Sequence, residues 1–488
     1  MIRSTPTHAT PATLPLPLLR LAALLLLLTA LVAGGWAPRA LAQVYDPETF
    51  TLSNGMKVVV VTNRRAPVVS HMVWYRVGAA DEPPGKSGIA HYLEHLMFKG
   101  TETIKPGEFS KTIARNGGED NAFTSWDYTA YFQNIARDRL ELVMTMEADR
   151  MRNLRLTEEI ARPELGVVIE ERKQRTDNNP SARLWEQVNA TLWVHHPYGI
   201  PIIGWMHEIE GLTYKDALAF YKDWYAPNNA ILVVAGDVTA AELKPLAEKT
   251  YGKVPAGKVR ERVRTQEPPQ AAARRVTLTD PQVRQPSWQR VWQAPSYNTA
   301  EGDAAYALDV LQSIMGDGAT SRIYSRLVVE RKLASSASMF YSGGSLDRGT
   351  IGISASPVPD GDLAALEKAI EEEVARLLKD GVTAEEVETA KKKLRRDAIF
   401  ARDSLQGPAY AFGLALTTGG TVEEVEDWPN RIAKVTVEQV NAAARAVLSQ
   451  TGHVTGILLP DPNAPKPAGP VPPAPPPGPP ATSAPQPR

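Results

Sequence analysis

The chain has 488 residues, of which 43% are hydrophobic and 22% charged, a balance typical of globular proteins with roughly two to four domains. Its formal net charge of -1 provides neither a basic field for binding nucleic acid nor an acidic one. The absence of cysteine excludes disulfides, thiolate metal sites and a cysteine nucleophile.

Residues 1–42 have the pattern of a signal peptide. Arg3 and Arg20 precede an apolar run over residues 21–33, and Ala40 and Ala42 provide small residues for cleavage before Gln43. The run is shorter than the roughly 20 residues that span a bilayer. We therefore expect export to the periplasm or medium, with no stable membrane span after cleavage; the alternative is an uncleaved membrane anchor.

In the first half of the mature chain, apolar alternation predicts strands and 3.6-residue periodicity predicts helices. Residues 50–62 are expected to form a hairpin with its turn at Asn54-Gly55. The further elements expected are a strand over 68–77, a helix over 89–98, a strand over 127–134, helices over 138–152 and 157–175, and a strand within 225–237.

The second half has patterns that repeat those of the first. A polar segment that contains proline separates them, so we predict domains over residues 43–265 and 274–460 with a linker at 266–273. The proline-rich end, residues 461–488, is expected to be an extended tail. The elements expected here are strands over 283–294 and 452–461 and helices over 303–315, 361–378 and 384–401. We predict an α+β fold of two duplicated domains.

The segment His91-Tyr-Leu-Glu94-His95 lies in the helix predicted over residues 89–98. Residues four apart share a helix face, so both imidazoles can bind one zinc ion, with Glu94 beside that face. Two histidines, a carboxylate and an open fourth position make a catalytic zinc site, where Glu94 would serve as general base. The alternative is a chance pattern without metal.

A third ligand is expected from the helix over residues 157–175, which carries Glu164, Glu170 and Glu171. Glu164 and Glu171 are two turns apart and share a face, whereas Glu170 is turned about 100° away from Glu171. Val167 and Val168 precede Glu171 by about one turn, which favours Glu171 as the inward residue. Without the histidine pair, these acids would be interpreted as solvated.

The sequence resembles the pitrilysin-type, or inverzincin, zinc metallopeptidase family, which includes insulin-degrading enzymes and mitochondrial processing peptidases. The resemblance covers residues 45–459 and implies two homologous α+β domains, each a mixed or antiparallel sheet with helices on one face, enclosing a cavity. Peptides or unfolded segments would be the substrates. The matching segments are 88–101, 117–131, 164–171, 196–199 and 225–229.

The resemblance also implies roles for individual residues. His91, His95 and Glu171 would bind one Zn²⁺ per chain, and Glu94 would be the catalytic base. Glu164 would be the second acid of its helix and support the ligand set. The implied activity is that of a zinc metalloendopeptidase.

A departure from the family pattern concerns substrate binding. Asn121 and Ala122 would lie on the strand whose edge pairs with the peptide, as in β-augmentation. Self-sufficient members also contribute an arginine and, seven residues later, a tyrosine from the second half. Val328 and Ser335 occupy those positions here. We therefore expect this chain to be the catalytic subunit of a heterodimer, as in bacterial two-subunit members, with a paralogous partner or else a second copy.

Two other interpretations remain open at this point. The first is a non-catalytic structural subunit, and the second is an exported peptide-binding chamber that holds metal only for stability. The complete set of histidines and acids favours the peptidase. No nucleic-acid partner is expected.

Overall fold

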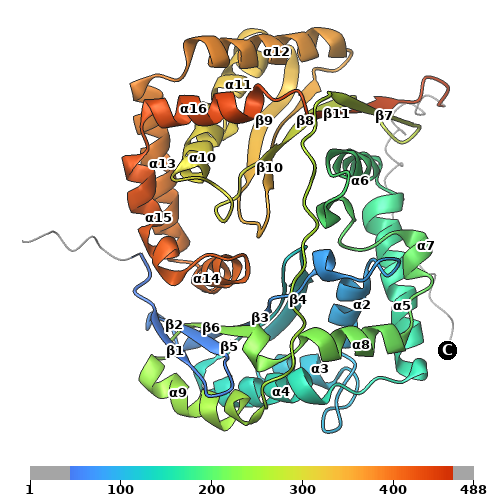
Figure 1. Ribbon diagram of the computed structural model, residues 1–488, viewed down its shortest axis with the longest axis vertical. Coiled ribbons are helices and arrows are strands. Elements are labelled where there is room, and N and C mark those ends of the chain that lie inside the picture. The colour runs from blue at the N-terminus through green and yellow to red at the C-terminus, as the bar shows by residue number, and fades with distance from the viewer. Residues whose placement is uncertain (1–43, 465–488) are drawn as a thin grey trace, which may run out of the picture. The chain divides into compact units, whose positions relative to one another are not determined.

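Two β-sheets, one in each half of the chain, organise the protein (Figure 1). The computed structural model describes residues 44–464, so the predicted signal peptide and the tail beyond residue 464 lie outside the described residues. Within the described range, no helix combines the length and apolar character needed to cross a membrane.

The first sheet has the strand order β1-β2-β6-β3-β5-β4. Strands β2 and β6 are parallel, and every other neighbouring pair is antiparallel. The predicted hairpin is confirmed, because β1 pairs with β2 and Gly55 takes a φ of 89° in the turn. The strands are β1 (Glu48–Thr51), β2 (Lys57–Thr62), β3 (Val68–Tyr75), β4 (Glu119–Thr124), β5 (Thr129–Ala136) and β6 (Ala230–Gly236).

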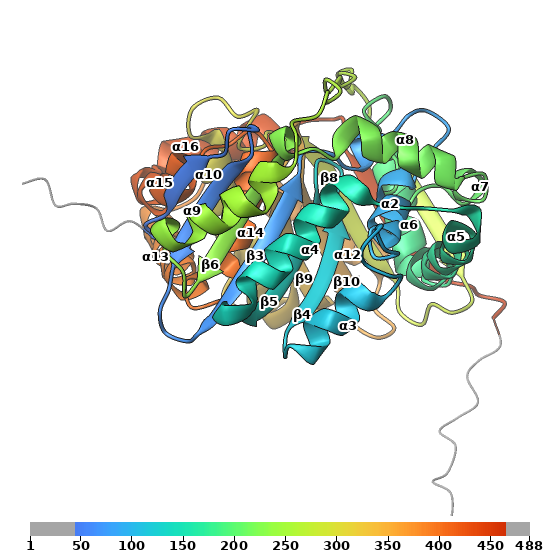
Figure 2. The same cartoon turned by 90° about the horizontal axis from the view of Figure 1, so that it is seen from below.

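Helices of the first half, apart from α6, pack on one face of this sheet, and Figure 2 shows α4 and α9 lying over its strands. Helix α6 packs against the second sheet instead. The opposite face of the first sheet contacts α14 (Gly407–Thr417) from the second half, where Trp74 and Phe412 are buried together. The first-half helices are α2 (Ile89–Leu96), α3 (Glu108–Arg115), α4 (Leu140–Asn153), α5 (Glu158–Arg172), α6 (Pro180–Leu192), α7 (Met206–Ile209), α8 (Tyr214–Trp224) and α9 (Ala240–Lys249).

The second sheet, β7-β11-β8-β10-β9, repeats the arrangement of the first. Its parallel pair is β7 and β11, and β8 lies antiparallel between β11 and β10 as β3 lies between β6 and β5. The predicted fold class, two mixed sheets with helices, is confirmed. The strands are β7 (Arg274–Asp280), β8 (Ser287–Ala294), β9 (Ala334–Ser342), β10 (Gly349–Pro357) and β11 (Val454–Pro460). The other helices are α10 (Ala304–Gly316), α11 (Arg322–Tyr324), α12 (Leu363–Asp380), α13 (Ala384–Ala401), α15 (Val422–Lys434) and α16 (Val437–Leu448).

The connection between the halves, residues 255–273, forms no helix or strand, and we call it the strap (Figure 1). Charged side chains of the strap form hydrogen bonds and ion pairs with the first half of the chain. The Glu267 carboxylate accepts hydrogen bonds from three successive backbone N–H groups, residues 194–196, each at 2.9 Å. The Arg264 guanidinium donates to Asp81 at 2.5 Å and to Asp127 at 3.0 Å. The domain boundaries at residues 265 and 274 stay predictions.

Candidate metal centre and peptide groove

Gly88 and the carboxylate of Glu82 hold the N-terminus of helix α2 in place. Gly88 has a φ of 85°, and a Cβ there would lie 2.5 Å from the carbonyl oxygen of Ile203, so the close approach requires glycine. The Glu82 carboxylate accepts hydrogen bonds from the N–H groups of Gly88 at 3.0 Å and Ala90 at 2.9 Å. A negative charge at a helix N-terminus is stabilising. These contacts fix the helix that carries the histidines.

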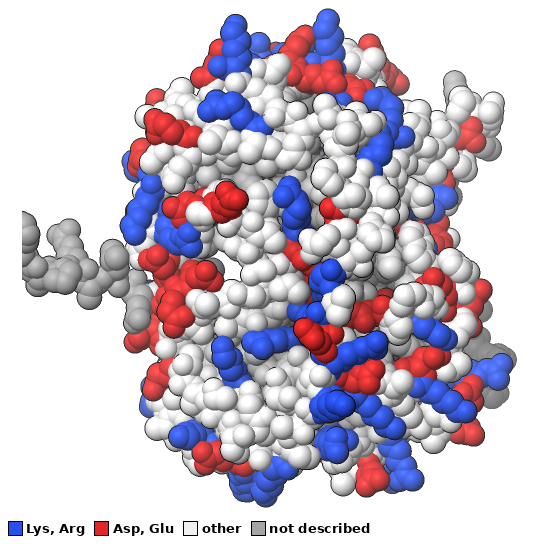
Figure 3. Space-filling model, in the orientation of Figure 1, with Lys and Arg blue, Asp and Glu red and all other residues white. Residues whose placement is uncertain are grey.

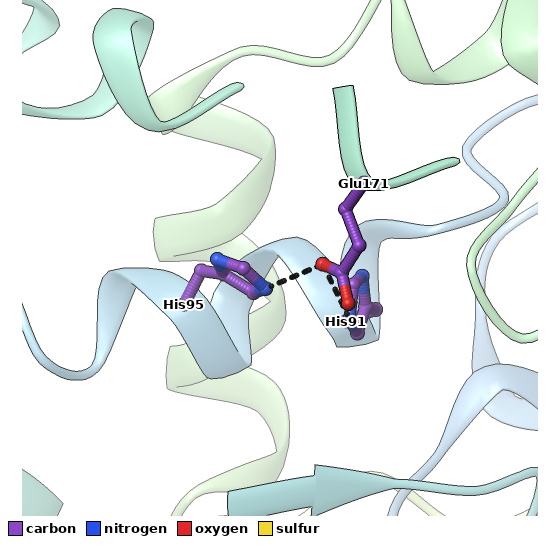
Figure 4. A group of neighbouring side chains, drawn as sticks. All are labelled: His91, His95 and Glu171. Atoms are coloured by element: carbon purple, nitrogen blue, oxygen red, sulfur yellow. Dashed lines mark ion pairs between the residues drawn. The ribbon is translucent and has the colours of Figure 1, made fainter. Parts of the chain in front are cut away.

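His91 and His95 on α2 and Glu171 on α5 point toward one another (Figure 4). Oε2 of Glu171 lies 3.6 Å from His91 Nε2 and 3.1 Å from His95 Nε2. Tetrahedral zinc with bonds of about 2.0–2.1 Å has ligand atoms roughly 3.4 Å apart, so this donor set fits the ion. It is the one potential metal-binding group found in residues 44–464.

Glu170, the neighbouring acid on α5, lies outside this group. Its side chain is 63% exposed and pairs with Lys173 at 2.6 Å. Glu171 instead directs one oxygen to the histidines, while its other oxygen lies 2.9 Å from Arg175. Glu171, and not Glu170, therefore points toward the histidines, and its role as a metal ligand stays a prediction.

The protonation of the two histidines differs. Burial, with His95 nearby, lowers the pKa of His91 to about 4, which leaves it as the neutral imidazole that metals bind. Burial also disfavours charge on His95, but hydrogen bonds to Glu164 and Glu171 outweigh it and raise the pKa of His95 to about 9. Metal binding requires that proton to leave, and a divalent cation would take its place between the ligands.

A second layer of contacts orients His95. Its Nδ1 lies 3.0 Å from Glu164 Oε1, and Lys99 Nζ lies 2.5 Å from Glu164 Oε2. An outer carboxylate of this kind fixes the orientation of a ligating imidazole. Glu164 thus lies behind His95, outside the residues that line the pocket. Lys99 was missed in the sequence, although it follows His95 by only four residues, just beyond the end of α2.

Glu94 is nearly buried, with 9% of its surface exposed, and lines one pocket together with His91, His95 and Glu171. Burial raises the pKa of its carboxyl group. Thr124 Oγ1 on β4 donates a hydrogen bond to Glu94 Oε2 at 2.5 Å. A carboxylate beside the three candidate ligands is the arrangement that a general base requires.

The pocket, about 620 Å³ in volume, is a groove between an edge strand and a helix. Asn121 and Ala122 line it from β4, which is the last strand of its sheet. The facing wall is one side of α6, formed by residues spaced three and four apart: Ala182, Trp185, Glu186 and Asn189. In the described chain, no strand pairs with the outer edge of β4. A peptide strand has room to pair there.

The two positions that depart from the family pattern lie outside the pocket. Val328 is half-buried against the hydrophobic core of the second half. Ser335 on β9 donates to the carbonyl oxygen of Pro357 at 3.0 Å and accepts from Gln285 at 2.9 Å. The described residues that line this pocket all fall between 91 and 203, so the second half contributes none of them.

Comparison with known proteins finds two matching family models and several related peptidases. The family model "Insulinase (Peptidase family M16)" matches residues 57–205, and "Peptidase M16 inactive domain" matches residues 211–394. "Zinc protease PqqE" of Helicobacter pylori is 32% identical over 424 residues, which cover 86% of this chain and 94% of the relative. A "Probable mitochondrial-processing peptidase subunit beta" of Schizosaccharomyces pombe is 27% identical over 440 residues, covering 84% and 92%.

Solved structures share the fold. A protease from Helicobacter pylori matches with a TM-score of 0.78 and 32% identity, covering 84% of this chain and 99% of that one. The first half of the periplasmic protease PqqL from Escherichia coli has a TM-score of 0.74 at 20% identity, covering 86% and 93%. Two repeated α+β halves and an inverted histidine motif define the class of two-domain inverzincin folds. The chain belongs to the M16, or insulinase, peptidase family.

Proposed function

We propose that the chain is a zinc-dependent endopeptidase that cleaves peptides or unfolded protein segments. One observation carries this proposal: His91, His95 and Glu171 converge in a pocket where the nearly buried Glu94 lies beside them. The pattern of residues 1–42 and the periplasmic relative support export of the chain. The names of the zinc-protease relatives support zinc as the metal.

Each residue of the site has a distinct task in the proposed reaction. Zinc held by His91, His95 and Glu171 would supply a Lewis acid that polarises the peptide carbonyl and favours proton loss from water. Glu94 takes the proton from the attacking water and passes it to the leaving amine nitrogen. Glu164 keeps His95 oriented.

The groove supports an extended peptide as substrate. Pairing with the open edge of β4 would hold the peptide through backbone hydrogen bonds, which give affinity with little sequence preference. On the face drawn in Figure 3, basic and acidic side chains are interspersed and neither forms one continuous patch.

We further propose that a paralogous partner completes the site. Val328 and Ser335 offer no guanidinium or phenol, and the second half lines none of the pocket. A second copy of this chain would bring the same two residues, so a homodimer does not supply what is missing. The relative named as a processing-peptidase subunit supports a division between two chains.

Hydrolysis of a quenched fluorescent peptide by the purified chain from Gln43 onward tests the proposal. We expect zinc to copurify with the chain. A chelator should abolish hydrolysis, and added Zn²⁺ should restore it. Addition of a paralogous chain that contains the arginine and tyrosine should raise kcat. Full activity without that chain would refute the partner proposal. Peptide binding without hydrolysis, with zinc and partner present, would instead support a non-catalytic chamber.

Replacing Lys99 with methionine is expected to weaken zinc binding by about 10–100-fold, because Glu164 then loses the ammonium group that holds it against His95. Competition with a chromophoric chelator measures the affinity. Lys105→Met, at an exposed position beyond the end of α2, is the matched control. Equal zinc affinity in both variants would show that Lys99 plays no part in orienting His95.

A further inference from the structure

The hydroxyl group of Thr124 contacts the proposed general base directly. Its Oγ1 lies 2.5 Å from Glu94 Oε2. Among the described residues, no other side chain donates a hydrogen bond to Glu94. Because the carboxylate is nearly buried, it has few alternative partners, and hydrogen bonds to charged groups are stronger than neutral ones. Thr124 therefore restricts where the carboxylate points.

The backbone of Thr124 faces the open edge of the sheet. The N–H of Ser125 points toward β5, because it donates a hydrogen bond to the carbonyl oxygen of Tyr128 at 2.8 Å. Successive N–H groups of a strand alternate in direction, so those of Thr124 and Ala122 point to the outer edge. At that edge the Ala122 N–H donates a hydrogen bond to Oδ1 of Asn121 at 2.8 Å. A peptide that adds to this edge thus pairs beside the residue that contacts Glu94.

We propose that Thr124 is a positioning residue for Glu94 and couples the peptide-binding strand to the base. This inference rests on the proposed peptidase function. With Oε2 held by Thr124, Oε1 of Glu94 stays available to accept the proton of water. A peptide paired with β4 and a carboxylate fixed by β4 then have a set relative position, which is how geometry contributes to rate.

A structural explanation for Thr124 exists and makes a different prediction. Threonine is β-branched and suits a strand for that reason alone. Valine has the same shape without the hydroxyl group, whereas serine keeps the hydroxyl group and loses the branch. If only shape matters, valine should replace threonine well. If the hydroxyl group matters, serine should.

Steady-state kinetics of the zinc-loaded chain, with its partner where required, separate these explanations. For Thr124→Val we expect kcat to fall about 10–100-fold, because a base displaced by a fraction of an ångström loses rate. The KM and the bound zinc should stay close to wild type, and Thr124→Ser should restore most of kcat. Thr145→Val, which removes an exposed hydroxyl group on α4, is the control. Unchanged kcat in Thr124→Val, or equal losses in the valine and serine variants, would overturn the proposal.

Infrared difference spectra of the metal-free chain supply a readout that needs no activity. The carboxylate stretching band of one glutamate should shift between wild type and Thr124→Val, and the shift should vanish in a Glu94→Gln background. Absence of the shift would overturn the inference. If the zinc-loaded wild-type chain hydrolyses no peptide even with its partner present, the peptidase proposal fails, and this band still decides whether Thr124 holds Glu94.

Discussion

Glu94→Gln is expected to lower kcat by about 10²–10⁴-fold while zinc stays bound, because an amide cannot accept the proton of water. Glutamine has nearly the shape of glutamate, so Thr124 can still donate to its carbonyl oxygen. The ligands His91, His95 and Glu171 are unchanged. The KM for the peptide should stay within a few-fold of wild type, which assigns the loss to the chemical step. Timed peptide-hydrolysis assays give kcat and KM, and the bound zinc is quantified in the same samples.

A matched substitution makes this result specific. Glu170→Gln removes one carboxylate from α5, next to a candidate ligand but with its side chain 63% exposed and paired with Lys173. Its activity should equal that of wild type. Activity that survives in Glu94→Gln would refute the role of Glu94. Zinc lost together with activity would mean that Glu94 holds the metal and would leave its role as a base unsupported.

Helical spacing accounts for how much of the site could be predicted from the sequence. His91 and His95 are one turn apart, and Glu164 and Glu171 are two turns apart, so each pair falls on one helix face. Thr124 could not be found in this way, because it reaches Glu94 from a strand thirty residues away in the sequence. Contacts between elements depend on how the sheet and helix pack, which periodicity does not report.

The fold shows the same division. Helices with an apolar stripe, such as those over residues 138–152 and 384–401, were predicted close to their observed bounds. Helix α14 was not predicted, because its sequence, GPAYAFGLALT, is apolar on most sides and lacks a stripe. The structure explains this composition, since α14 packs against the sheet of the other half. Composition predicted a linker at residues 266–273, but the contacts that hold the longer strap gave no sequence signal, because each involves a single charged residue.

Arg264→Met is expected to lower the free energy of unfolding by about 3–5 kcal/mol, because it removes one partner from a buried group of charges. The Arg264 side chain is only 7% exposed and donates to Asp81, Asp127 and the carbonyl oxygen of Ala80. Asp127 in turn accepts from the backbone N–H of Leu346, in the second half, at 3.0 Å. Urea unfolding followed by tryptophan fluorescence measures the change.

The pH dependence of this loss tests its cause. Burial already raises the pKa of Asp81, and Arg262 and Arg264 act to lower it. Without Arg264 the pKa of Asp81 in the folded state rises further. A raised carboxyl pKa makes the folded protein less stable as pH increases, because the folded state holds the proton more tightly than the unfolded state does. The difference between Arg264→Met and wild type should therefore widen as the pH rises from acidic toward neutral values. Val263→Ala, at a side chain 81% exposed on the same strap, should change stability little at any pH. A constant difference across pH would assign the loss to packing, and the strap would then join the halves through shape and not through charge.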